Sequence, residues 1–173
     1  MDHALPWVRA VLATTPERWS AMTAQMPDDL LRREAAPGEW SAVDCLRHLR
    51  DGERDVFQVR LRAFQAGQDL VPYDPDRDGR PASGETPAEL AADFARLRAE
   101  SLSLLEDVSP ADLEITVTHG EYGPVRLSEM VAYWAAHDLM HMVQAERALI
   151  QPFAADSGPW RVMLADHDFA RRD

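Results

Sequence analysis

Two histidines, His137 and His141, stand four residues apart in a segment with the apolar periodicity of a helix. Four residues are slightly more than one helical turn, so both imidazoles project from the same face. That face also carries residues that we assign to the core, namely Met130, Trp134, Ala145 and Ala148. Burying an unpaired polar ring is costly, whereas neutral imidazole is a common metal ligand and this spacing lets two rings converge on one ion. The pair therefore indicates a metal site that needs a third ligand.

Four helical segments are expected to position these residues: about 6–26, 41–67, 86–107 and 128–152. Ser41 with Asp44, and Thr86-Pro87 with Glu89, are capping-box helix starts. Thr15-Pro16-Glu17 also has the composition of a helix start, which favours an interruption of the first segment. The fourth segment is expected to end near Pro152, because proline removes a helical hydrogen bond.

The remaining segments are predicted to be links and a tail. Residues 68–85 hold three prolines, two glycines and four aspartates without periodicity, which predicts a long surface loop, functional or mobile. Residues 115–125 suggest a short extended or hairpin excursion before the fourth helix. We therefore predict an all-α fold, an up-down-down-up four-helix bundle over residues 1–152. In the tail, residues 153–173, apolar side chains are expected to dock on the same domain: Trp160, Val162, Met163 and Leu164.

The second helix supplies a third histidine, His48, at the edge of its apolar arc. Ligand sites in bundles are built from side chains on facing helices, so His48, His137 and His141 form a candidate three-histidine site. Three protein ligands with an open position are typical of a catalytic rather than a structural metal. Zinc and nickel are the leading candidates, and iron and copper also suit imidazole ligands. A single core histidine would more often be structural, but three at helix-compatible positions favour one divalent ion.

These motifs also carry a resemblance to a known family. Residues 38–41 (Gly-Glu-Trp-Ser), residues 46–49 (Leu-Arg-His-Leu) and residues 137–144 resemble the DinB-like superfamily. The resemblance implies a four-helix bundle whose metal is held by His48, His137 and His141, and the family's usual glutamine matches Gln144. Some relatives are S-transferases that use bacillithiol, mycothiol or glutathione, and one branch is a thiol-dependent maleylpyruvate isomerase. Others are labelled metal-dependent hydrolases or damage-inducible proteins, and relatives are often dimers.

Three functions remain open at this point. In a thiol S-transferase, the metal would deprotonate a small thiol, which would then attack an electrophilic substrate. A metal-dependent hydrolase would need a carboxylate base beside a metal-bound water, and Asp55, Glu121 and Asp138 are only loose candidates. The chain lacks the H-E-x-x-H arrangement that places such a base. The third alternative is a non-catalytic, stress-linked metal-binding protein.

Other residues near the expected site have two interpretations each. His119 could line the mouth of the site, but an exposed loop histidine is the more frequent case. Cys45 could be a soft fourth ligand, although a buried inert thiol is more typical. Asp44 and Asp138 could orient ligand imidazoles or could be solvated carboxylates on helix faces. Trp40 and Trp134 are interpreted as core anchors.

The amino-acid composition excludes several classes of binding partner and reaction. A formal net charge of −12 argues against nucleic acid and anionic membranes, which reward clustered positive charge. All 18 basic residues are arginine, which excludes lysine chemistry. The single cysteine fits a reducing compartment, and neither a secretory signal nor a membrane span is expected, so we predict a cytoplasmic protein. No phosphate loop or dinucleotide fingerprint is present.

Overall fold

The computed structural model describes residues 4–73 and 84–168. Helices and short strands follow one another along the chain in this order: α1 (Ala4–Gln25), α2 (Asp28–Leu31), α3 (Ala42–Gly52), the π-helical turn η1 (Glu53–Phe57), α4 (Gln58–Ala66), α6 (Pro87–Glu106), the 3-10 turn η2 (Asp112–Glu114), β1 (Thr116–His119), β2 (Gly123–Arg126), α7 (Leu127–Asp156) and the 3-10 turn η3 (Gly158–Leu164). None of the helices in this part of the chain is both long and apolar enough to cross a membrane.

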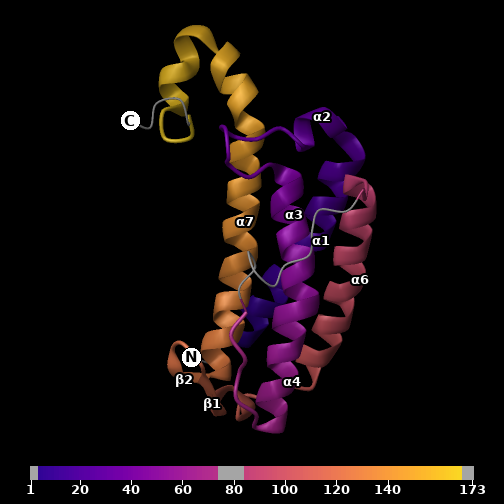
Figure 1. The fold of residues 1–173 in the computed structure, drawn as a ribbon, viewed down its shortest axis with the longest axis vertical. Helices are drawn as coiled ribbons and strands as arrows, with labels where there is room; N and C mark the ends of the chain where they lie inside the picture. The colour runs from indigo at the N-terminus through magenta and orange to yellow at the C-terminus, as the bar shows by residue number, and fades with distance from the viewer. Residues whose placement is uncertain (1–3, 74–83, 169–173) are drawn as a thin grey trace.

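Four long helical arms lie side by side (Figure 1). The first arm, α1, runs up; the second (α3, η1 and α4) and the third, α6, both run down; and α7 runs up. The predicted up-down-down-up bundle is therefore confirmed. Because the second and third arms both run down, a long link must return the chain to the top of the bundle. The end of this link lies beside α2, where Arg32 donates to the Glu85 carbonyl (3.0 Å). Most of the loop expected over residues 68–85 lies outside the described residues.

Capping residues mark the beginning of α3 and of α6 and the end of α4. The Ser41 hydroxyl accepts from the Asp44 N–H (3.2 Å), and Asp44 accepts from the Ser41 N–H in return (3.1 Å). Thr86 and Glu89 form the same box at the start of α6. Gly67 closes α4 with a positive φ of 62°, which glycine adopts without a steric penalty.

Two expectations at prolines are wrong: the interruption of the first helix at Pro16 and the end of the fourth helix near Pro152. Helix α1 continues through Pro16, and α7 continues through Pro152 to Asp156. Proline cannot donate to the carbonyl four residues earlier, so Pro16 leaves the Leu12 carbonyl without its helical partner. That carbonyl accepts instead from Arg98 Nη1 (3.0 Å), so a tertiary hydrogen bond replaces the helical one. Beyond Pro152, Ala154 in the last turn of α7 is fully buried.

The predicted excursion is a two-stranded antiparallel hairpin in which Val117 faces Val125. The link that follows α4 joins this hairpin, because the Leu70 N–H donates to the Thr118 carbonyl (2.8 Å) and Leu70 pairs with His119. The hairpin is therefore fixed against the end of α4.

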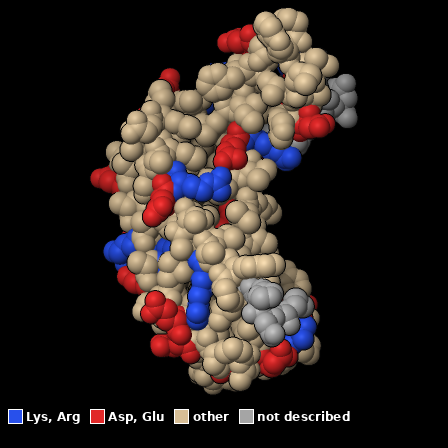
Figure 2. Space-filling model, turned by 180° about the vertical axis from the view of Figure 1, so that it is seen from behind, with Lys and Arg blue, Asp and Glu red and all other residues tan. Residues whose placement is uncertain are grey.

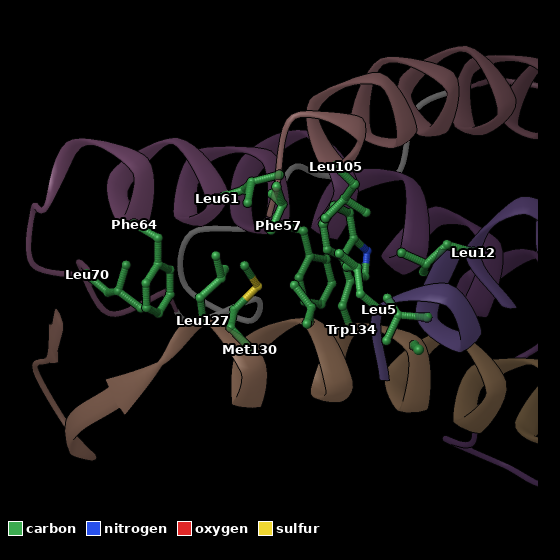
Figure 3. Close-up of a cluster of buried hydrophobic side chains, with 14 of the residues drawn as sticks. Leu5, Leu12, Phe57, Leu61, Phe64, Leu70, Leu105, Leu127, Met130 and Trp134 are labelled. Atoms are coloured by element: carbon green, nitrogen blue, oxygen red, sulfur yellow. The ribbon is translucent and has the colours of Figure 1, made fainter. Parts of the chain in front are cut away.

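The core consists of two apolar clusters separated by a polar layer. One cluster contains Phe57, Leu61, Met130 and Trp134 (Figure 3). The other is built around Trp19, Leu46, Phe94 and Met142. Between them each arm contributes a polar residue with at most 1% exposure to one hydrogen-bonded network: Thr15 from α1, Glu53 from η1, Arg98 from α6 and Asp138 from α7.

The end of α7 and η3 project beyond the bundle (Figure 1). Trp160, Val162 and Met163 are 73%, 63% and 80% exposed, so the expected docking of these side chains is not seen. The segment folds back on α7 instead, where Gln151 Nε2 donates to the His167 carbonyl (2.8 Å). On the face of the molecule shown in Figure 2, arginines and acidic side chains are interspersed.

Candidate metal centre

His48 from α3 and His137 and His141 from α7 converge at one point. One ring nitrogen from each of the three lies within 4.8 Å of those of the other two. His48 Nε2 and His137 Nε2 are 3.0 Å apart, and the ring centroids of both histidines lie 4.5 Å from that of His141. Among the described residues, no other histidine, cysteine or carboxylate joins this group.

Burial keeps the two imidazoles of α7, those of His137 and His141, neutral. The pKa of His137 is lowered to about 3, first by burial and then by the neighbouring His141 and His48. The pKa of His141 is lowered as well, again mainly by burial. Neutral imidazoles whose nitrogens face one another present converging lone pairs, which is the donor set that divalent zinc, nickel or iron accepts. The residues present therefore fit a metal ion.

Gln144 determines which nitrogen of His141 faces the centre. His141 Nδ1 lies 2.9 Å from Gln144 Oε1, and an amide oxygen can only accept. The ring proton is therefore on Nδ1, which leaves Nε2 free to bind a metal. Trp40 stacks on the same ring, with centroids 5.6 Å apart and planes 15° apart. Trp40 thus forms a wall of the site as well as packing against the core.

Next to the histidines, Arg98 anchors the polar layer. Its guanidinium donates to Glu53 Oε1 and Oε2 (both 2.9 Å) and to Asp138 Oδ1 and Oδ2 (3.0 and 2.7 Å). Trp134 Nε1 also donates to Glu53, and the Thr15 hydroxyl also donates to Asp138. Since Asp138 adjoins His137 in α7, this network fixes the helix backbone from which two of the histidines project.

A cavity of about 700 Å³ opens beside His48 and His137, between the second arm, α7 and the hairpin. Its walls are partly aromatic, with Trp40, Phe57, Tyr122 and Tyr133 among the residues that line it. Most carboxylates on its walls are already ion-paired: Asp44 with Arg47, Asp51 with Arg50 and Arg54, and Glu129 with Arg126. Glu121 also lines the cavity and has no ion pair among the described residues.

The structure decides between the alternative interpretations of several residues. His119 is only 4% exposed and lines the cavity, so it is not an exposed loop residue. Asp138 bonds to Thr15 and Arg98, and Asp44 to Ser41 and Arg47, so neither bonds to a histidine within the described chain. Cys45 is fully buried in an apolar cluster outside the histidine group. Burial raises the pKa of its thiol to about 12.

Three features of the site have no counterpart in the sequence prediction: the Arg98 network, Arg60 on the cavity wall, and the π-helical turn Glu53–Phe57. Arginine and glutamate are usually exposed, so nothing in their local pattern marks Arg98 and Glu53 as buried partners. The spacing of Glu53 is the one local signal of its burial. Glu53 lies seven residues after Leu46 and four after Leu49, on the apolar face of its helix.

Comparison with known proteins places the chain in a family. The family model described as the DinB superfamily matches residues 12–145, well over half of the chain. The chain belongs to the DinB superfamily. A relative from Oceanobacillus iheyensis, provisionally named a metal-dependent hydrolase, is 25% identical over 107 residues, which are 61% of this chain and 62% of the relative. The chain thus matches less than two thirds of that protein's length.

A solved structure shares the fold. YfiT from Bacillus subtilis, described provisionally as a metal-dependent hydrolase with an unusual four-helix bundle topology, matches with a TM-score of 0.71. The identity is 17%, and the match covers 83% of this chain and 85% of YfiT. This likeness is one of fold, and it agrees with the up-down-down-up order of the four arms.

Proposed function

We propose that this DinB superfamily protein is a metal-dependent enzyme that transfers a low-molecular-weight thiol to an electrophilic substrate. His48, His137 and His141 would hold one divalent ion, and the thiol and its acceptor would meet in the adjoining cavity. The observation that carries the proposal is the convergence of three imidazoles at the edge of a cavity of about 700 Å³. Three protein ligands leave a coordination position for a small molecule.

A bound divalent ion would lower the pKa of a coordinated thiol, which is mostly protonated at neutral pH. The protein's own contribution is to hold and shield the reactants. Gln144 orients His141, and Trp40 and Phe57 cover the histidines with aromatic surface that excludes water. In the net reaction the thiol proton goes to solvent, sulfur bonds to the electrophilic carbon, and the leaving group departs with its bonding electron pair.

The test is a panel of small thiols assayed with a generic aryl halide, using protein before and after chelation. We expect turnover that requires both the added thiol and the metal, with at least one thiol well above the uncatalysed rate. His141→Ala should lose this activity, whereas the matched control His167→Gln, a histidine outside the group, should keep it. Turnover that is independent of added thiol would contradict the transferase proposal.

Metal-dependent hydrolysis is the second candidate, and one observation favours it. That observation is the histidine group itself, because a coordination position left open by three protein ligands would bind water as well as a thiol. The names of the two relatives described above also point to hydrolysis. An ester substrate turned over without added thiol, with the turnover lost on chelation and in His141→Ala, would support this candidate.

A purely structural metal is the least supported alternative. Such a site is normally closed by a fourth protein ligand. Within the described residues the group contains only the three histidines, and Cys45 lies outside it.

A further inference from the structure

Arg60 shares the cavity wall with His48 because of the π-helical turn between them. In a regular α-helix, residues 12 positions apart differ in direction by about 120°. The turn at Glu53–Phe57, closed by the Gln58 N–H on the Glu53 carbonyl, accommodates one additional residue. The effective spacing becomes about 11 residues, or three turns, which places both side chains on nearly the same face at ~16 Å along the axis.

Arg60 differs from the other arginines near the cavity in its partners. Arg47, Arg50 and Arg54 each contact a carboxylate, whereas Arg60 has none within 4.0 Å among the described residues. Its closest polar neighbour is His119 Nε2, 3.2 Å from Arg60 Nη2. Burial lowers the pKa of Arg60, with Tyr133, Tyr122 and Glu121 acting in the opposite direction at longer range.

The contact between Arg60 and His119 leaves hydrogen-bond donors without an acceptor. His119 Nδ1 accepts the Glu121 N–H (3.1 Å), so the proton of the neutral ring is on Nε2. Burial and the charge of Arg60 both lower the pKa of His119, which keeps the ring neutral. An N–H of the guanidinium and the Nε2–H of the imidazole therefore face each other. Two adjacent donors of this kind are satisfied when an anionic oxygen accepts from both.

We propose that Arg60 and His119 bind a carboxylate group of the substrate in the cavity that His48 and His137 also line, with Arg60 about three helical turns beyond His48 on the same arm. This inference rests on the proposed function in taking the cavity as the substrate site, but the binding itself needs no metal. A carboxylate fits better than a phosphate because Glu121 lies nearby and would repel a dianion more strongly. Tyr122 stacks on His119 (centroids 4.6 Å apart), which provides an aromatic surface for the apolar part of the ligand.

The experiment measures binding of benzoate by isothermal titration calorimetry, with benzamide as the neutral isostere and inorganic phosphate as the competing anion. Metal-loaded and chelated protein are both titrated, so that direct ligation of the metal is separated from binding at Arg60. Arg60→Gln removes the cation. Arg62→Gln is the matched control, because Arg62 lies on the same helix, contacts Gln58 and is not on the cavity wall. Arg60→Lys serves as the second variant if Arg60→Gln does not fold.

We expect chelated wild-type protein and Arg62→Gln to bind benzoate alike, and Arg60→Gln to bind it about tenfold or more weakly, as for loss of a hydrogen bond to a charged group. Arg60→Lys should be intermediate, and benzamide should not distinguish the variants. Metal content should be unchanged in every Arg60 variant, whereas failure of the proposed function would appear as metal retained in His141→Ala. Equal benzoate affinity in Arg60→Gln and wild type, no saturable benzoate binding, or tighter binding of phosphate would overturn the inference.

Discussion

Removal of Arg98 should be among the most destabilising single changes in the bundle. Its side chain is 1% exposed, and its two ion-pair partners, Glu53 and Asp138, are 0% and 1% exposed. Arg98→Met would leave two carboxylates in the core without their shared cation. It would also leave the Leu12 carbonyl, already deprived of a helical donor by Pro16, without its Arg98 hydrogen bond.

The expected cost follows from this geometry. Breaking a buried ion pair by removing one partner typically costs about 3–5 kcal/mol, because an uncompensated charge stays buried. Here one cation serves two carboxylates, so we expect the upper part of that range. For a chain of this size a cost of about 4–5 kcal/mol corresponds to a fall in Tm of ~8–20 °C. The matched control is Arg96→Met on the same helix. Arg96 is 59% exposed and pairs only with surface carboxylates, so its loss should cost at most about 1 kcal/mol.

The assay is urea unfolding followed by far-UV circular dichroism for wild type, both single variants and the triple variant Arg98→Met/Glu53→Leu/Asp138→Leu. Because the triple variant removes the buried charges together, it should be more stable than Arg98→Met alone. This comparison remains informative if the single variant does not accumulate as folded protein. A cost for Arg98→Met equal to that of Arg96→Met, or a triple variant less stable than the single one, would refute the reasoning.

Three further predictions concern single residues. Gln144→Ala should weaken metal affinity by about 10–100-fold, because the acceptor that fixes the His141 tautomer is lost. Gln144→Glu keeps an acceptor and should preserve the affinity, and a metal titration with a competing chelator measures both variants. Cys45 should not react with an aromatic disulfide reagent at about pH 8, because burial raises its pKa to about 12 and keeps the thiol protonated. The thiol should react once urea unfolds the chain, and rapid labelling of the native protein would contradict the prediction. Ser41→Ala should cost about 1 kcal/mol in urea unfolding by removing the cap of the helix that carries His48, and no measurable loss would mean that the cap is redundant.

The elements that could be predicted are those whose cause is local. Ser41 and Thr86 mark helix starts because each cap is satisfied within three residues of chain. His137 and His141 share a face because of helical spacing alone, and the facing helix supplies His48. The four-helix bundle followed from the number and lengths of the predicted helices and their links, together with the family resemblance.

What could not be predicted depends on partners distant in the chain. Pro16 is tolerated in α1 because Arg98, 82 positions later, donates to the carbonyl that it leaves free. Glu53 is buried because Arg98 and Trp134 converge on it from two other arms. The π-helical turn follows from no local sequence rule, yet it determines that Arg60 lies on the same cavity wall as His48.

The most direct test of the metal centre is elemental analysis of protein purified without added metal or metal-affinity chromatography. We expect about one divalent transition-metal ion per chain in wild type and in His167→Gln. His48→Ala, His137→Ala and His141→Ala should each lose that ion, with the helical fold retained as judged by circular dichroism. Full metal retention in the folded alanine variants, or wild-type protein that binds no such ion even when supplied with it, would show that the three histidines are not the ligands of a metal ion.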